Sequence, residues 1–259
     1  MIALAIIACV LLLAAGLSLS WYLDNRLVAL VSIALACAAI GSSFVFRSSP
    51  APRSGIAIAV DDSCDAAPVG PQILHSIRSM LARGVSGDAA VVLAWFAADA
   101  RSTRELILAL TEPRPASTRG DDVAFENWKA PRRQQAEQAM TKLKTQPCER
   151  VGTSVVGAVV AANDELEQAQ VTGPREIVLV TNLIEFSRAL KIEAASFGPA
   201  DVPAAVQAIA QLPDSLRPRL GADTTVKVLV VPVVRNRGVE FPLAEETAIA
   251  LQTWAKEVF

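Results

Sequence analysis

The sequence predicts an α/β fold in which a mostly parallel sheet is covered by helices on both faces. Apolar runs indicate buried strands, and the main ones lie at 56–60, 177–181 and 226–233. Between them are segments whose apolar residues recur at helical spacing, which is typical of helices that pack one face on a sheet. Strands that alternate with helices favour a Rossmann-like sheet.

The segment Gly55–Asp65, GIAIAVDDSCD, joins the first buried strand to a cluster of polar residues. In open α/β sheets, ligands bind at the carboxyl ends of the strands. Asp61, Ser63 and Asp65 offer only oxygen ligands, which Mg²⁺, Mn²⁺ and Ca²⁺ prefer. His75 is the only histidine of the chain and is expected to be a partly exposed helix residue, so sites built on several histidines are excluded.

Two later segments are expected to meet this strand end. Val151–Ala162 begins with a Gly-Thr-Ser turn and continues as an apolar helix, which places Thr153 and Ser154 at a helix start. Arg175–Asn182 is a buried strand that ends in a polar pair. Oxygen ligands from three separate segments would then lie at one edge of the sheet.

This arrangement resembles the von Willebrand factor A (VWA) domain and its metal-ion-dependent adhesion site (MIDAS). That family carries Asp-x-Ser-x-Ser after its first strand, a Thr in a later loop and an Asp after its fourth strand. The chain departs from the pattern at two positions, where an acid replaces a Ser and an amide replaces an Asp, so the site is degenerate. The matching positions are Asp61, Ser63, Asp65, Thr153 and Asn182.

The resemblance covers roughly residues 54–258 and implies a Rossmann-like VWA fold. It also implies that these five residues bind a divalent cation, Mg²⁺ or alternatively Mn²⁺ or Ca²⁺. Asp65 and Asn182 would coordinate this cation directly or through water. In that family a protein partner binds through an acidic side chain that completes the coordination of the cation. No catalytic residue is implied.

The rest of the domain is expected to contain two further strands, four helices and a surface loop. The short connection after the second strand favours an antiparallel hairpin with the third, and VWA domains have such an edge strand. Residues 111–131 carry three prolines and are expected to form a surface loop. Residues 183–198 have no assignable period. We expect helices at 70–83, 132–144, 202–212 and 243–258, the last with Trp254 toward the sheet, and strands at 89–97 and 105–110.

The N-terminal 47 residues are predicted to form a transmembrane hairpin. Ile2–Tyr22 and Leu27–Phe46 contain no charged residue, and each matches the length of about 20 residues that spans a bilayer. Residues 48–54 are rich in Pro and Ser and form a linker to the domain at 55–259. A cleaved secretory signal is the alternative, but no Lys or Arg precedes Asp24 and the apolar run is longer than is usual for one. A buried pair of soluble helices would lack a comparably apolar partner.

The distribution of charged residues indicates on which side of the membrane the domain lies and argues against nucleic acid as a partner. The chain has a net charge of −2 and no basic stripe, so nucleic acid is not an expected partner. Arg47 and Arg53 flank one side of the hairpin against Arg26 on the other, which favours a two-pass protein of the cell membrane with a cytoplasmic domain. Cys64 and Cys148 lie in loops that would converge, so the two thiols are expected to be close.

The sequence therefore favours a membrane-anchored protein-interaction module that is not an enzyme. A haloacid-dehalogenase-like phosphatase is an alternative, since Thr181 and Asn182 imitate its second motif, but its first motif needs a second Asp where Ser63 stands. A receiver-type phosphoacceptor lacks a clear acceptor. A metal-free structural α/β scaffold also stays open, because Asp and Ser after a strand often cap a helix or close a turn.

We predict that residue 25 and the C-terminal residue 259 lie on opposite sides of the membrane, because a four-residue connection joins the two charge-free spans. Single Asn25→Cys and Phe259→Cys variants, without the four native cysteines, should react with an impermeant thiol reagent from opposite sides. Labelling of both from one side would contradict the hairpin.

Overall fold

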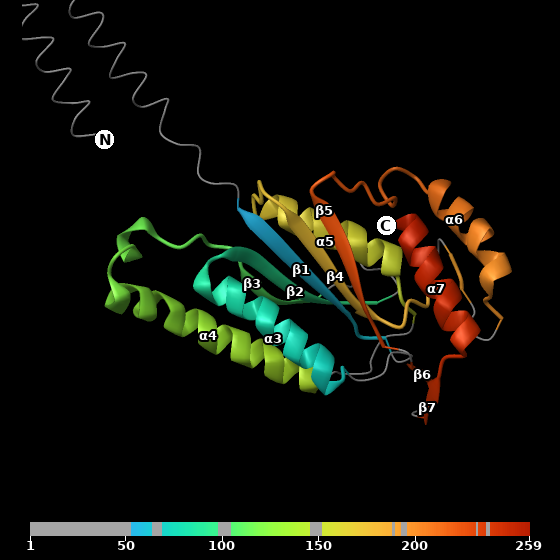
Figure 1. Ribbon diagram of the computed structural model, residues 1–259, viewed down its shortest axis with the longest axis horizontal. Coiled ribbons are helices and arrows are strands. Elements are labelled where there is room, and N and C mark those ends of the chain that lie inside the picture. Colours follow the sequence, from blue (N-terminus) through green and yellow to red (C-terminus); the bar gives the residue numbers. More distant parts are fainter. Residues whose placement is uncertain are drawn as a thin grey trace, which may run out of the picture. The chain divides into compact units, whose positions relative to one another are not determined.

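The computed structural model describes most of the chain from Arg53 onward (Figure 1). The predicted transmembrane hairpin, residues 48–52 of the linker, Cys64, Asp65 and Cys148 lie outside the described residues. Within the described part, no helix combines the length and apolarity that crossing a membrane needs. The described ranges are 53–63, 69–97, 105–145, 152–187, 190–192, 196–231, 233–236 and 239–259.

Five strands form one sheet in the order β3-β2-β1-β4-β5. β1 pairs in parallel with both β2 and β4, and β5 pairs in parallel with β4. β3 pairs antiparallel with β2, so the predicted mostly parallel sheet with an antiparallel edge strand is confirmed. The strands are β1 (Ser54–Asp61), β2 (Ala89–Phe96), β3 (Glu105–Leu110), β4 (Arg175–Thr181) and β5 (Thr224–Val230).

Helices cover both faces of this sheet, as predicted (Figure 1). α5, α6 and α7 pack on one face, and α3 and α4 pack on the other. Side chains of β1 alternate between the two cores, because successive strand residues point to opposite faces. The helices are α3 (Pro71–Ser86), α4 (Asp122–Lys144), α5 (Val155–Gln168), α6 (Val202–Ala210) and α7 (Glu245–Val258), with 3₁₀ turns at Ala116–Thr118 and Pro199–Asp201.

The expected loop at 111–131 was wrong over its second half, because α4 already begins at Asp122. The carboxylate of Asp121 accepts the N–H of Ala124 at 2.9 Å and caps this helix, and Asp122 occupies its first turn. Pro131 lies inside the helix, where the ring removes one backbone hydrogen bond but does not end it.

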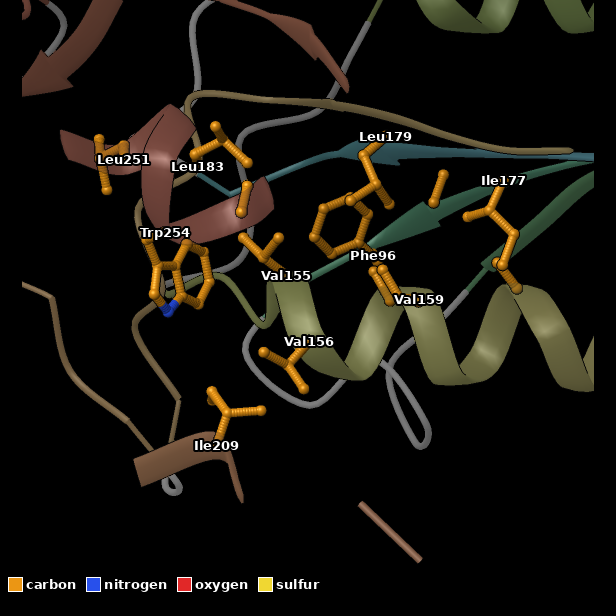
Figure 2. Packing of buried hydrophobic residues seen from close by; sticks show 14 of the residues in the cluster. Phe96, Val155, Val156, Val159, Ile177, Leu179, Leu183, Ile209, Leu251 and Trp254 are labelled. Atoms are coloured by element: carbon orange, nitrogen blue, oxygen red, sulfur yellow. The ribbon is translucent and has the colours of Figure 1, made fainter. Parts of the chain in front are cut away.

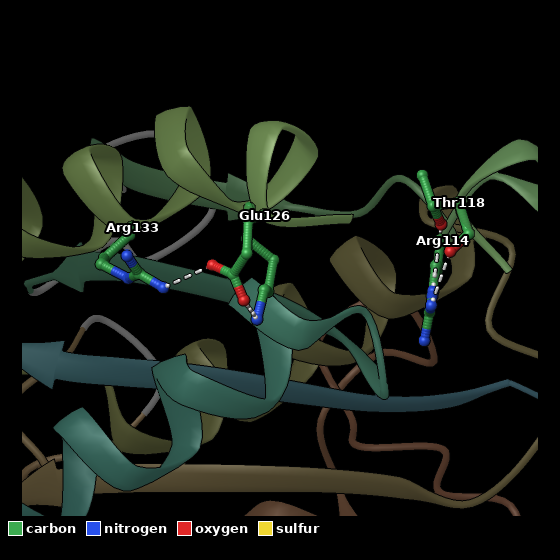
Figure 3. A network of polar contacts seen from close by, with 5 residues as sticks. Arg114, Thr118, Glu126 and Arg133 are labelled. Atoms are coloured by element: carbon green, nitrogen blue, oxygen red, sulfur yellow. Dashed lines mark hydrogen bonds and ion pairs between the residues drawn. The ribbon is translucent and has the colours of Figure 1, made fainter. Parts of the chain in front are cut away.

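Polar contacts on α4 support the part of the helix around this proline. Glu126 lies 2.6 Å from Lys129 and 3.4 Å from Arg133, so its carboxylate bridges two cations one turn apart (Figure 3). In the segment before α4, Arg114 donates to the hydroxyl of Thr118 at 3.0 Å and to its carbonyl at 2.9 Å. These contacts hold part of the segment 111–131, which the prolines of the sequence led us to expect as a loop.

A second departure follows β5. The predicted strand at 226–233 ends at Val230, and Val233–Asn236 belongs to a separate hairpin as β6, paired antiparallel with β7 (Val239–Pro242). The sequence has a proline at 232, and proline has no backbone N–H to donate to a sheet. The predominantly apolar sequence VKVLVVPV at 226–233 favoured one long strand, although it contains Lys227 and a proline at 232.

Trp254 on α7 is fully buried in the core between the sheet and the helices α5, α6 and α7, as expected (Figure 2). Ile249, on the same helix, keeps 54% of its surface exposed. The two residues therefore form a matched pair for testing which face of α7 stabilises the fold.

We predict that Trp254→Ala lowers the free energy of unfolding by about 3–5 kcal/mol, the usual cost of emptying a large aromatic site. Ile249→Ala should cost less than about 1 kcal/mol. Urea denaturation of the compact unit Pro52–Phe259 measures both. Equal losses in the two variants would show that α7 packs differently.

Candidate functional site

Asp61 is the last residue of β1, the central strand of the sheet, and its carboxylate is 2% exposed. It accepts the backbone N–H of Ser63 at 3.0 Å. It also accepts the hydroxyl of Thr181, the last residue of β4, at 3.1 Å. Strand β4 lies beside β1, so the carboxyl ends of two parallel strands meet at this carboxylate.

Thr153 reaches the same carboxylate from the start of α5. Its Oγ1 lies 3.1 and 3.2 Å from the two carboxylate oxygens of Asp61, and 2.9 Å from the Oγ of Ser63. Gly152, just before it, has a φ of 87°, a left-handed conformation that favours glycine. Three of the predicted ligands, Asp61, Ser63 and Thr153, are therefore brought together.

Backbone hydrogen bonds fix the position of the Thr153 turn. The N–H of Ser154 donates to the carbonyl of Ala97 at 3.1 Å, and the N–H of Phe186 donates to the carbonyl of Thr153 at 2.7 Å. The hydroxyl of Ser154 then accepts the N–H of Gly157 and caps α5, as the sequence predicted. The turn is thus held between the end of β2 and the loop that follows β4.

The loop after β4 begins with Asn182, whose amide is 2% exposed. Its Oδ1 accepts the N–H of Ile184 at 3.0 Å, which closes a turn within the loop. The next residue, Leu183, has a φ of 64° and donates its N–H to the hydroxyl of Thr181 at 3.1 Å. Asn182 therefore lies next in sequence to a residue that binds Asp61, and its predicted role as a ligand stays a prediction.

Sequence reasoning did not predict that Thr181 binds Asp61, and it missed the buried carboxyl group of Glu185. Glu185 is 1% exposed, and its Oε2 accepts the N–H of Val156 at 3.0 Å, in the first turn of α5. A carboxylate is favourable there, because the first N–H groups of a helix lack partners within the helix. A single Glu in the unassigned segment 183–198 gave no periodic signal that could have identified it.

Burial changes the acidity of both carboxyl groups. Desolvation raises the pKa of Asp61 to about 6, against the opposing effect of hydrogen bonds from Ser63, Thr153 and Thr181. Desolvation also raises the pKa of Glu185 to about 7, and hydrogen bonds from Ser187, Val156, Val155 and Ser154 oppose it. Each ionised carboxylate is therefore less stable here than in water.

The spacing of the oxygen atoms around Asp61 suits both a hard divalent cation and a network of hydrogen bonds. Neighbouring ligands of Mg²⁺ lie about 3.0 Å apart, because Mg–O bonds of about 2.1 Å meet at right angles. The separations of 2.9–3.2 Å among the oxygens of Asp61, Ser63 and Thr153 match this value. The same separations suit O–H···O hydrogen bonds, so the hydroxyl hydrogens satisfy the carboxylate when no cation is bound.

The charge available to such a cation is small. In the described ranges, no group of three or more His, Cys, Asp or Glu side chains is placed to hold a metal ion. Mg²⁺ commonly keeps several water molecules and takes one or two carboxylates from the protein.

No protein-family model matches the chain, and no curated protein matches it. Among solved structures, the conserved hypothetical protein BatB from Bacteroides thetaiotaomicron is 17% identical, with a TM-score of 0.40, over 78% of this chain and 87% of that one. The type V pilus tip protein Mfa5 from Porphyromonas gingivalis is 14% identical, with a TM-score of 0.30, over 61% and 26%. The pilus adhesin RrgA from Streptococcus pneumoniae is 12% identical, with a TM-score of 0.30, over 65% and 25%.

The chain thus spans about a quarter of the length of the two pilus protein chains. These low identities and scores assign no family to the chain.

We predict that the free energy of unfolding of the Pro52–Phe259 unit falls as pH rises from about 4 to 7. The folded pKa values of Asp61 and Glu185 lie above those of unfolded carboxyl groups, so the folded state holds protons that the unfolded state has lost. Their stabilising effect is complete below the unfolded pKa values and disappears as pH passes about 6 for Asp61 and about 7 for Glu185. Each group changes the free energy by about 3 kcal/mol, at about 1.4 kcal/mol per pKa unit.

Glu185→Gln keeps the shape and the acceptor oxygen but removes the titration. This variant should therefore be more stable than the parent at pH 8 and show a flatter profile between pH 5 and 7. Urea denaturation across this range measures the difference, with Glu137→Gln on the exposed surface of α4 as the control. A profile of Glu185→Gln that parallels the parent would contradict the buried titration.

Proposed function

We propose that the chain is a membrane-anchored protein-interaction module whose binding surface is the carboxyl edge of the sheet. A divalent cation, Mg²⁺ or alternatively Mn²⁺ or Ca²⁺, would be held weakly at its centre. Asp61, Ser63 and Thr153 would be its direct ligands. Asp65 and Asn182 would contribute directly or through water, as the resemblance to VWA domains implies.

The observation that carries this proposal is the convergence of oxygen side chains on Asp61. Ser63 and Thr153 are separated by 90 positions in sequence, yet their hydroxyl oxygens lie 2.9 Å apart beside one carboxylate. A turn is closed by hydrogen bonds between residues that are close in sequence, such as the bond from the N–H of Ser63 to the carboxylate of Asp61. The contacts of Thr153 from the start of α5 and of Thr181 from the end of β4 go beyond a local turn, and they support a ligand site.

Each residue would have a distinct role. Asp61 supplies the charge that attracts the cation, and the cation in turn stabilises the ionised form of a carboxylate that burial disfavours. Thr181 keeps the carboxylate oriented through its hydrogen bond at 3.1 Å. When bound, the cation would provide an open coordination position for a carboxylate of the partner protein.

Binding is better supported than phosphatase chemistry. A haloacid-dehalogenase-like mechanism needs a second acid two residues after the nucleophile, and position 63 is a serine whose Oγ lies 2.9 Å from Thr153. β5 carries Thr, Val, Lys and Leu but no acidic residue. We therefore propose that the chain is not an enzyme.

We predict that the Pro52–Phe259 unit binds Mg²⁺ or Mn²⁺ weakly in calorimetric titration and that Asp61→Asn abolishes this binding. The amide keeps the shape of the side chain but removes the charge. Asp223→Asn is the matched control, because this exposed residue directly precedes β5 at the opposite end of the sheet. Thermal melting of both variants shows whether the fold is retained, and equal metal binding by Asp61→Asn and the parent would place the site elsewhere.

The substitution Asn182→Asp should act in the opposite direction. We expect it to tighten metal binding at least roughly ten-fold, since one added charge about 4 Å from a cation contributes on the order of a few kcal/mol at an effective dielectric constant of about 20. The same titration measures this change. Unchanged affinity would remove Asn182 from the ligand set and would favour the metal-free scaffold.

A further inference from the structure

β5 is an edge strand of the sheet, and its outer side has no partner strand among the described strands. Among the described strands, β5 pairs only with β4, and the strands that follow it pair with each other as a separate hairpin. An edge strand presents backbone N–H and C=O groups that can pair with another extended chain. This edge lies between α3 and α7 in Figure 1.

A groove follows this edge and has a volume of about 730 Å³. Its walls come from three elements, because α3 contributes from one face of the sheet, α7 from the other, and β5 lies between them. An added strand would place alternate side chains on opposite faces of the sheet. Apolar side chains are available to receive both sets, namely Ile73 of α3, Val226, Val228 and Leu229 of β5, Ala255 of α7 and the terminal Phe259.

Two exposed lysines, Lys227 and Lys256, lie along this edge. Lys227 is the middle residue of β5 and keeps 59% of its side chain exposed. Its Nζ lies 2.8 Å from Glu176, but the same carboxylate also lies 3.9 Å from Arg83, so two cations share one anion. Lys256 of α7 adds a further positive charge to the groove. An acidic side chain would complement this edge.

The position of Lys227 argues against a second copy of this chain. A twofold antiparallel pairing centred on β5 would place Lys227 opposite Lys227 of the other copy. Like charges directly opposite one another destabilise a strand pair, and lysines on edge strands discourage pairing of sheets. A different chain with an acidic residue at this place avoids that repulsion.

We propose that the β5 edge binds an extended peptide segment of another protein, which adds to the sheet as a sixth strand. The segment alternates apolar residues with at least one Asp or Glu that faces Lys227. Recognition combines backbone hydrogen bonds along β5 with apolar contacts in the groove, as in other strand-addition complexes. None of Asp61, Ser63 and Thr153 lines this groove, although Leu183, which follows Asn182, does.

The test uses the full chain and two capped peptides of seven residues, the length of β5. One alternates Val with Glu, and the other alternates Val with Lys. Hydrogen exchange followed by mass spectrometry should show slower exchange over 224–230 with the Glu peptide, and fluorescence anisotropy gives the affinity of each labelled peptide. We expect the Glu peptide to bind more tightly than the Lys peptide.

Charge reversal tests the specificity. Lys227→Glu should weaken binding of the Glu peptide roughly ten-fold and make the Lys peptide the better ligand, since one attraction becomes a repulsion. Lys142→Glu makes the same change of charge on the exposed surface of α4 and should leave both affinities unchanged.

Three results would overturn the proposal. The first is protection of another segment, such as β3, in place of 224–230. The second is an affinity for the Glu peptide that Lys227→Glu does not change, or no binding of either peptide at about millimolar concentration. The third is slow hydrogen exchange of β5 in the absence of peptide together with the mass of a dimer, which would show that a second copy of the chain pairs with β5.

Discussion

The carboxyl edge of the sheet depends on one buried carboxylate, that of Asp61. It collects hydroxyl groups from its own loop, from the start of α5 and from the end of β4, through Ser63, Thr153 and Thr181. These hydroxyls are themselves buried, so loss of the carboxylate would leave donors without an acceptor at a cost of about 1–3 kcal/mol each. The carboxyl group of Asp61 therefore links three segments that sheet pairing and backbone hydrogen bonds bring together.

The loop after β4 is held by the core as well as by this charge. Leu183 has a left-handed φ of 64°, a conformation that costs of order 1–3 kcal/mol in a residue other than glycine. Its side chain is 1% exposed and lies in the same core as Trp254 and Leu251, and burial of a leucine is worth about 1.5–3 kcal/mol (Figure 2). Two residues later, Glu185 ties the loop to the first turn of α5. The loop geometry is thus fixed without any cation.

The sequence was sufficient to predict the members of the cluster that follow a clear strand end or helix start. Asp61 and Ser63 follow an apolar run, and Thr153 precedes an apolar helix, so each has a local signal. Thr181 was recognised only as part of the polar pair that ends its strand, because a β-branched residue at this position also fits the strand pattern. Glu185 lies where the chain has no regular period, and only the tertiary fold brings it to a helix start. In α4, Asp121 and Asp122 were readable cap signals, but the prolines around them favoured a loop.

Burial of the Asp61 carboxylate carries a free-energy cost that bears on the proposed cation. At neutral pH an ionised Asp61 with a folded pKa of about 6 costs about 3 kcal/mol relative to the unfolded chain. Hydrogen bonds from Ser63, Thr153 and Thr181 already oppose this cost, so the remainder is what hydroxyl groups cannot offset. A neutral acceptor at position 61 would hold the same hydroxyls without the cost of burying a charge. In the proposed site, a cation in contact with the carboxylate would supply the opposite charge that the hydroxyl groups do not provide.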